Sequence, residues 1–240
     1  MKDKKNRLIV FCDFDGTITQ KDLGDEVFKE FGKFEPYHTQ LVSGEIGIKQ
    51  YWHDLCGTIP PDISENDIFQ MAAETPVDPY FHNFVEYLEK EDIPMVVISD
   101  GFDSYIKPIL KREGLDHLPV LSNKLIFSED QVKPHFPRAS ESCECMCASC
   151  KRNSMLSQTA DDSIIVYIGD GYSDFCAAEH SDLIFAKRNL AAYCNEHRIP
   201  HHPFKTFFDV KRILSKLINE NKLKQRNVSS VKRKQAFEIE

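Results

Sequence analysis

The sequence predicts an α/β fold in which helices cover both faces of a parallel β-sheet and a helical cap is inserted after the first strand. Short apolar runs rich in β-branched residues alternate with helical apolar periodicity along the chain. A long and mostly helical stretch, residues 20–77, separates the first run from the second. Polar clusters follow the runs directly, at the positions where parallel strands lead into ligand-binding loops.

The strands of the sheet are predicted from four short apolar runs. These runs cover residues 7–13, 94–99, 163–168 and 182–186, and residues 121–132 add a small β excursion. Helical apolar stripes lie between them, over residues 79–90, 104–113, 173–180 and 207–217. Strands that alternate with helices in this way are typical of a parallel sheet with helices on both faces.

The stretch between the first two strands is too long for one crossover helix, so it predicts an inserted cap. It contains three helical patterns, and the last of them begins with a capping box from Ser64 to Asp67. The predicted division is a Rossmann-like core over residues 1–19 and 78–218 and a helical cap over residues 20–77. Residues 219–240 are rich in Lys, Arg, Asn and Gln and predict a flexible tail.

Composition and charge restrict the class of protein. The 240 residues are 41% hydrophobic and 28% charged, which is ordinary for a soluble globular protein. Their number suffices for one sizeable core or for one domain that carries a smaller inserted one. A formal net charge of −8 argues against a nucleic-acid partner, which selects a basic surface. No stretch approaches the roughly 18 apolar residues of a membrane span or forms a signal peptide, so we expect a cytoplasmic protein. Oligomeric state has no signal in the sequence.

Two carboxylates directly after the first strand predict the chemistry. Asp13 and Asp15 can point into one crevice, because alternate side chains of a strand share a face. Adjacent carboxylates favour a hard cation between them, and Mg²⁺ suits oxygen ligands and phosphate. One carboxylate can then attack phosphorus while the other serves as general acid and base. The alternative is an Asx-turn that only closes the strand.

Two further strand ends supply partners for this pair. Asp170 and Asp174 follow the third strand and could complete an oxygen cage for the metal, or else cap the helix that begins there. Ser99 follows the second strand. Its hydroxyl and the backbone N–H groups of Asp100 and Gly101 could hold phosphate oxygens at a helix entrance, or form a plain turn.

These pieces, in this order, resemble the haloacid dehalogenase superfamily of phosphatases. Residues 13–17 match the first motif, Ser99 the second, Lys151 the third and residues 169–174 the fourth. The resemblance implies that Asp13 is a nucleophile that forms an aspartyl-phosphate. Asp15 would protonate the leaving oxygen and then activate water.

The resemblance also assigns the ligands of the metal and of the phosphate. Mg²⁺ would be bound by Asp13, Asp170 and the backbone carbonyl of Asp15, with Asp174 steering its shell. Lys151 and Ser99 would hold the transferring phosphoryl group. Because Asp15 is an aspartate, hydrolysis or mutase chemistry is favoured over ion pumping.

The substrate is predicted only as a small phosphorylated metabolite. The cap after the first motif resembles the branch that contains phosphoserine phosphatase. Residues 94–110, residues 177–186 and the cysteine-rich run before Lys151 resemble phosphatases of 2-hydroxy-3-keto-5-methylthiopentenyl-1-phosphate in methionine salvage. The alternatives are phosphoserine or another small ester, a mutase, and a non-catalytic regulatory or binding protein on the same fold.

A cysteine cluster immediately precedes the third motif and consists of Cys143, Cys145, Cys147 and Cys150. Four thiols in so short a run could bind a structural Zn²⁺ that fixes this loop, although Cys-x-Cys steps are tighter than the usual spacing. His135 could replace one of them. The alternatives are inert reduced thiols and a redox pair formed by Cys147 and Cys150.

Overall fold

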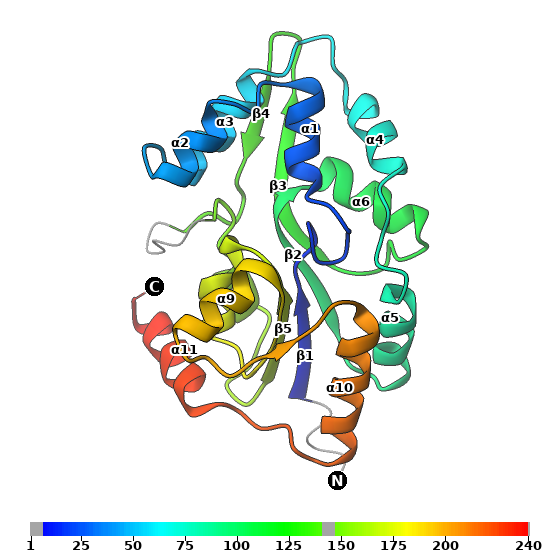
Figure 1. The fold of residues 1–240 in the computed structure, drawn as a ribbon, viewed down its shortest axis with the longest axis vertical. Helices are drawn as coiled ribbons and strands as arrows, with labels where there is room; N and C mark the ends of the chain where they lie inside the picture. Colours follow the sequence, from blue (N-terminus) through cyan, green and yellow to red (C-terminus); the bar gives the residue numbers. More distant parts are fainter. Residues whose placement is uncertain (1–6, 141–146, 240) are drawn as a thin grey trace.

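The computed structural model describes residues 7–140 and 147–239, in which a seven-stranded sheet carries helices on both faces (Figure 1). The strand order is β4-β3-β2-β1-β5-β6-β7, and every neighbouring pair is parallel except β3 and β4. The strands are β1 (Leu8–Cys12), β2 (Met95–Phe102), β3 (Val120–Phe127), β4 (Val132–His135), β5 (Ile164–Gly169), β6 (Leu183–Ala186) and β7 (His202–Pro203). The predicted fold class, a Rossmann-like parallel sheet with an inserted helical cap, is confirmed.

The helices of the described residues fall into a group that follows β1 and a group that surrounds the sheet. The first group is α1 (Leu23–Phe31), α2 (Tyr37–Ser43), α3 (Ile48–Gly57) and α4 (Glu65–Ala73). The second is α5 (Phe81–Lys90), α6 (Asp103–Arg112), α7 (Lys151–Leu156), α8 (Phe175–Glu179), α9 (Arg188–Glu196), α10 (Phe207–Asn219) and α11 (Asn227–Ile239), with a 3₁₀ turn η2 (Tyr172–Asp174) before α8.

Alternate side chains of the central strands pack into two separate hydrophobic cores, one on each face of the sheet. Val10 and its neighbours on one face pack with apolar residues of α5, α6 and α10, such as Phe84. Phe11 and Ile165 on the other face pack with residues of α7, α8, α9 and α11, such as Leu190. Burial of each such side chain contributes about 1.5–3 kcal/mol to the stability of the fold. The alternation of side chains along the strands therefore determines which of them face each group of helices.

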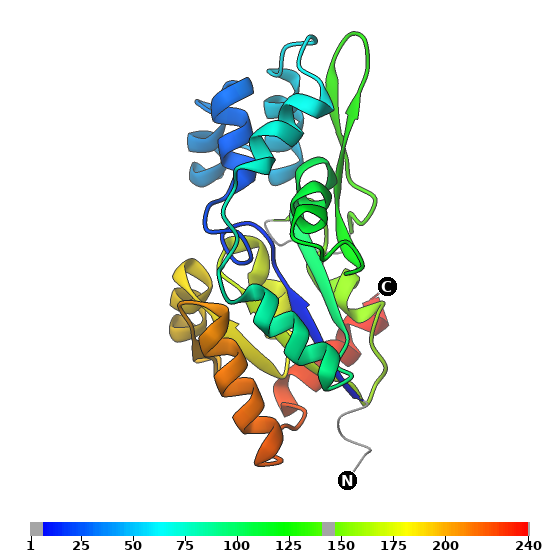
Figure 2. The same ribbon diagram turned by 90° about the vertical axis from the view of Figure 1, so that its right-hand side faces the viewer.

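The helices α1 to α4 lie beyond the carboxyl edge of the sheet, beside the β3–β4 hairpin (Figures 1 and 2). The expected capping box begins α4, where Asp67 Oδ2 accepts the Ser64 N–H at 2.8 Å. The predicted β excursion is larger than expected, because β3 joins the main sheet beside β2 and β4 pairs with it as a hairpin. The hairpin contacts α3, and the rings of His53 and Phe136 lie 5.7 Å apart.

The segment predicted as a flexible tail contains a helix, α11, over residues 227–239 that the sequence did not predict. Ser229 Oγ donates to Asp182 Oδ1 at 2.6 Å, and Arg233 Nη1 donates to the same oxygen at 3.1 Å and to the His180 carbonyl at 2.8 Å. The buried Asp182 carboxylate requires such donors. Polar contacts hold this helix in place, and a search for apolar periodicity does not detect them.

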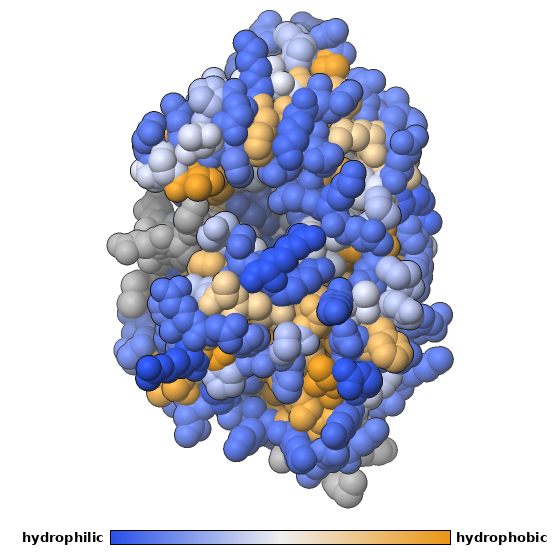
Figure 3. All heavy atoms as spheres, viewed as in Figure 1, coloured by the Kyte–Doolittle hydropathy of each residue, from blue (hydrophilic) through white to orange (hydrophobic). Residues whose placement is uncertain are grey.

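The surface is mainly hydrophilic on the face seen in Figure 3, where apolar residues form small separate groups. Among residues 7–140 and 147–239, no helix is both long and apolar enough to cross a membrane. The carboxyl edge of the sheet lies between the two halves of the molecule, with α1 to α4 on one side and the sheet on the other (Figure 2). The predicted polar residues meet at this edge.

Candidate active site

Three aspartates come together at the carboxyl edge of β1 and β5. Asp13 follows β1, Asp170 follows β5 and Asp174 ends the η2 turn. One carboxylate oxygen from each lies within 4.8 Å of the others, and all three residues are buried. The register explains the meeting, because Cys12 pairs with Ile168 and the two parallel strands therefore end together.

Lys151 provides the positive charge of this cluster. Its Nζ donates to Asp13 Oδ1 at 2.5 Å and to Asp174 Oδ1 at 2.6 Å, and the residue is only 2% exposed. Burial disfavours the ammonium ion, but the two carboxylates outweigh burial and hold the pKa of Lys151 above its ordinary value. Burial, together with the charge of Asp174, raises the pKa of Asp13. The cluster therefore concentrates negative charge around one cation.

Asp174 is fully occupied by protein donors. Besides Lys151, the Tyr167 hydroxyl donates to Oδ1 at 2.6 Å, and the N–H groups of Asp170 and Gly171 both donate to Oδ2 at 2.9 Å. A Cβ on Gly169 would lie 2.5 Å from Oδ2, so only glycine permits this approach. Asp174 is 0% exposed and orders the loop after β5. Asp13 and Asp170 have fewer protein donors and are better placed to offer oxygens to an ion.

Asp170 is held beside the turn that follows β1. The Thr17 hydroxyl donates to Oδ1 at 3.1 Å and Arg188 Nη1 donates to Oδ2 at 2.9 Å. Gly16 permits this contact, because its φ is +69° and a Cβ there would lie 2.6 Å from Asp170 Oδ2. Burial and the charge of Asp174 raise the pKa of Asp170, so a cation would be stabilised here. Buried carboxylate oxygens of this kind fit Mg²⁺.

Asp15 is held by residues of α1, α6 and β2. Its Oδ1 accepts the Leu23 N–H of α1 at 3.0 Å. Its Oδ2 accepts the hydroxyls of Tyr105 at 2.9 Å and Ser99 at 3.4 Å. Burial, with the nearby charge of Asp22, raises the pKa of Asp15 to about 8. A carboxyl group with such a pKa keeps a proton at neutral pH, as a general acid requires.

Ser99, Asp100 and Gly101 lie within the last part of β2, which extends to Phe102, and not after the strand as predicted. Ser99 Oγ accepts the Gly101 N–H at 2.9 Å, so that amide is engaged within the protein. The Asp100 side chain accepts the N–H groups of Ala148 at 2.7 Å and Ser149 at 2.6 Å, in the loop before α7. The predicted phosphate contacts of the Asp100 and Gly101 amides therefore remain predictions.

Asp100 also connects this loop to the cap. The indole Nε1 of Trp52, on α3, donates to Asp100 Oδ2 at 3.5 Å. Asn123, on β3, donates through Nδ2 to the Asp100 carbonyl at 2.7 Å. Burial raises the pKa of Asp100 to about 6. Asp100 thus joins the cap, the hairpin and the segment that positions Lys151 through its carboxyl group and its backbone carbonyl.

The cysteine cluster is described only in part, because Cys143 and Cys145 lie outside the described residues. Cys147 and Cys150 are buried. A hydrogen bond with Cys150, together with burial, raises the pKa of Cys147 and favours an unreactive thiol. The metal-ligating side chains that meet within the described ranges are the three aspartates, so the predicted Zn²⁺ site receives no support.

Sequence reasoning missed several side chains of the site. Thr17 and Arg188 bind Asp170, Tyr167 binds Asp174 and Tyr105 binds Asp15. Arg188 directly follows the β6 region, so the rule that placed the other residues at strand ends would have found it. Tyr105 lies on a helix whose apolar stripe includes it, and nothing local separates it from core residues.

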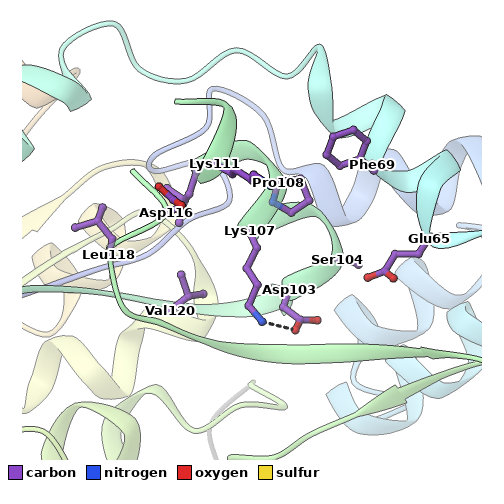
Figure 4. A pocket seen from close by; sticks show the side chains of 11 residues that line it. Glu65, Phe69, Asp103, Ser104, Lys107, Pro108, Lys111, Asp116, Leu118 and Val120 are labelled. Carbon is purple, nitrogen blue, oxygen red and sulfur yellow. Dashed lines mark hydrogen bonds and ion pairs between the residues drawn. The ribbon is translucent and has the colours of Figure 1, made fainter. Parts of the chain in front are cut away.

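A cavity of about 510 Å³ lies away from these aspartates, between α4 and α6 (Figure 4). Lys107 and Asp103 line it and are joined by an ion pair of 3.0 Å. Phe69 of α4 faces it from the cap. None of the predicted site residues lines this cavity, so it is a separate feature of the boundary between cap and core.

Comparison with known proteins agrees with the geometry. The family model of haloacid dehalogenase-like hydrolases matches residues 10–179. A 2-hydroxy-3-keto-5-methylthiopentenyl-1-phosphate phosphatase of Brevibacillus brevis is 31% identical over 217 residues, which cover 89% of this chain and 98% of that protein.

Solved structures show the same fold. A probable phosphoserine phosphatase from Vibrio cholerae has a TM-score of 0.69 at 22% identity, over 93% of this chain and 69% of that one. A phospho-aspartyl intermediate analogue of phosphoserine phosphatase has a TM-score of 0.64 at 18% identity, over 87% of this chain and 97% of that one. The family match and the curated relatives establish that this chain is a phosphatase of the haloacid dehalogenase-like hydrolase family.

Proposed function

We propose that the chain is a Mg²⁺-dependent phosphomonoesterase that hydrolyses a small phosphate ester through an aspartyl-phosphate on Asp13. One observation carries the proposal: a buried aspartate at the end of β1 lies 2.5 Å from the ammonium group of a buried lysine, Lys151. Asp170 lies beside it and faces the same space. This is the arrangement that phosphoryl transfer requires, since the reaction depends on position and charge neutralisation.

In the first step, an oxygen of Asp13 attacks phosphorus and the bond from phosphorus to the substrate oxygen breaks. Asp15 gives its proton to that leaving oxygen. In the second step, Asp15 takes a proton from water, the water oxygen attacks phosphorus and the bond to Asp13 breaks. Inorganic phosphate leaves and Asp13 is restored.

The phosphoryl oxygens would be held by Lys151, which contacts Asp13, and by the Ser99 hydroxyl, which contacts Asp15. Asp13, Asp170 and the backbone carbonyl of Asp15 would bind Mg²⁺, with Asp174 fixing the loop around it. The ion would offset the charge of the phosphoryl group and of these carboxylates. Its fit rests on the buried oxygen donors, whose pKa values are raised by burial and by the charge of Asp174.

For the substrate we propose 2-hydroxy-3-keto-5-methylthiopentenyl-1-phosphate. The support is the name of the Brevibacillus relative, which aligns over almost its full length. Phosphoserine is the second candidate, because the solved structures with this fold include phosphoserine phosphatases. Those structures are less than 25% identical in sequence to this chain, so they support the phosphatase chemistry more than the choice of substrate.

The test is phosphate release from a panel of small esters that includes both candidates. Wild type should release phosphate with Mg²⁺, lose activity in EDTA and recover when Mg²⁺ is added. Asp13→Asn should lower the activity at least a thousand-fold, as loss of a nucleophile does. The variant should keep the circular dichroism of the wild type. Substantial turnover by Asp13→Asn would contradict the nucleophile, and no release from any ester would support a non-catalytic protein.

A further inference from the structure

The hydroxyl of Tyr105 contacts Asp15, although Tyr105 itself has no role in the proposed reaction steps. The residue lies on α6 and is 0% exposed. Its hydroxyl donates to Asp15 Oδ2 at 2.9 Å, while the Leu23 N–H of the cap donates to Asp15 Oδ1 at 3.0 Å. The carboxyl group is therefore held at both oxygens, by Tyr105 and more distantly by Ser99 of the core at Oδ2, and by the cap at Oδ1.

Two glycines leave room for this hydroxyl. A Cβ on Gly101 would overlap the Tyr105 hydroxyl and would lie 2.5 Å from Asp15 Oδ2. A Cβ on Gly24, in α1, would lie 3.3 Å from the same hydroxyl. The φ of Gly101 is not positive, so a side chain is excluded there by space and not by backbone conformation. The core and the cap thus both contribute a residue without a side chain at the point where Tyr105 meets Asp15.

The ordinary alternative is a buried tyrosine that needs a partner for its hydroxyl. The chain holds such a pair elsewhere: the Tyr193 hydroxyl donates to Glu179 at 2.8 Å, between α9 and α8. The Tyr105 pair differs in two respects. Its acceptor is the carboxyl group that the proposed function requires to move a proton, and the opposite oxygen of that carboxyl group is bound by the cap.

We infer that Tyr105 is a positioning residue for Asp15, and that its hydroxyl directs the carboxyl group toward the leaving oxygen of the substrate. The inference rests on the proposed role of Asp15 as general acid. Proton transfer requires the acid within hydrogen-bond reach and correctly aligned, so a carboxyl group free to rotate would be a poorer donor. The loss should be greatest for esters whose leaving oxygen most needs the proton.

Tyr105→Phe tests this, because it removes the hydroxyl and keeps the ring. The readout is kcat/KM for an alkyl phosphate and for p-nitrophenyl phosphate, since this ratio reports the step that expels the leaving group. Nitrophenolate leaves without a proton, whereas an alkoxide does not. We expect a loss of about ten-fold or more for the alkyl ester and about two-fold or less for the aryl ester. Tyr193→Phe, the matched control, should leave both values unchanged.

A double variant shows whether Tyr105 acts through Asp15. Asp15→Asn alone should give the same dependence on the leaving group, and adding Tyr105→Phe should lower the alkyl rate no further. Equal losses on the two esters, no loss, or fully additive losses would each overturn the inference for Tyr105. Equal losses in Asp15→Asn itself would instead overturn the role of Asp15 in the proposed function, and the inference with it. Circular dichroism and the unfolding temperature show that each variant folds.

Discussion

The two sides of the site differ in what holds them. The core side, which consists of Asp13, Lys151, Asp170 and Asp174, is joined by hydrogen bonds between elements of the sheet domain. The cap side, which consists of Asp15 and Asp100, is held in part by donors of the cap. These donors are the Leu23 N–H at 3.0 Å and the Trp52 indole at 3.5 Å.

This difference separates two tasks of the proposed reaction. The groups of the core side, which would accept the phosphoryl group and bind the metal, make these contacts to other residues of the core. Asp15, which would deliver the proton, and Asp100, which connects to the Lys151 loop, also have contacts from the cap. A cap that closes over the substrate would therefore couple substrate choice to proton transfer. Substitutions can therefore perturb the core side or the cap side separately.

The largest effect is expected on the core side, from Lys151→Met. The substitution leaves Asp13 and Asp174 buried without their shared cation, so we expect the free energy of unfolding to fall by about 3–5 kcal/mol in metal-free buffer. Phosphate release should fall at least a hundred-fold, because a phosphoryl ligand is lost. Urea unfolding and phosphate assays measure the two. Lys107→Met removes an exposed ion pair and should change neither the stability nor the phosphate release. Equal stability of Lys151→Met and wild type would show that Lys151 does not stabilise the two buried carboxylates.

Metal binding should act on the same side. Mg²⁺ added to EDTA-treated protein should raise its stability by about 2.7 kcal/mol at a hundred times the Kd, because the ion binds the folded state alone. A thermal scan with increasing Mg²⁺ measures this as a rising Tm. Asp170→Asn should abolish most of the rise, whereas Asp161→Asn, on an exposed turn, should retain it. An equal rise in both variants would place the ion elsewhere.

A pH dependence is expected on the cap side, where burial raises the pKa of Asp15 to about 8. The unfolded chain has a pKa near 4, so between these values the folded protein keeps a proton that the unfolded chain releases. The stabilising contribution is therefore complete below about pH 4 and is lost as the pH rises through 8.

Asp15→Asn lacks this titration and serves as the reference. The stability of wild type minus that of the variant should fall by about 1.4 kcal/mol for each pH unit between pH 5 and 7, in urea unfolding without metal. A difference that is flat over this range would show that the folded carboxyl group titrates normally.

The smallest effect is expected from Trp52→Phe, which removes the indole N–H that reaches Asp100. The aromatic contacts of the ring with Phe28 and Phe102, at 5.7 and 5.1 Å between centroids, are largely retained. We expect a loss of about 1 kcal/mol in stability and a few-fold rise in KM with little change in kcat, because the cap is loosened. Tyr80→Phe, on the exposed surface of the core, is the control. A large fall in kcat would contradict the separation of tasks.

The α/β class, the main strands and the polar residues at their ends could be predicted from the sequence, because these signals are local. Apolar runs with period two orient strands, and carboxylates that follow parallel strands share one edge. The sequence also predicted that Asp13, Asp170, Asp174 and Lys151 would meet, and the structure places them together. The helix over residues 227–239 was missed, because buried polar contacts stabilise it and apolar periodicity does not.

The sequence by itself determined the fold, the set of acidic residues at the sheet edge and the family to which they point. Only the tertiary structure decided which oxygen each donor reaches: that Asp174 is saturated, that Asp100 joins the cap to the Lys151 loop, and that Tyr105 and Leu23 hold Asp15. The physical reason is range. Periodicity and turn chemistry act over a few residues, whereas a hydrogen bond between residues 15 and 105 exists only after the chain has folded.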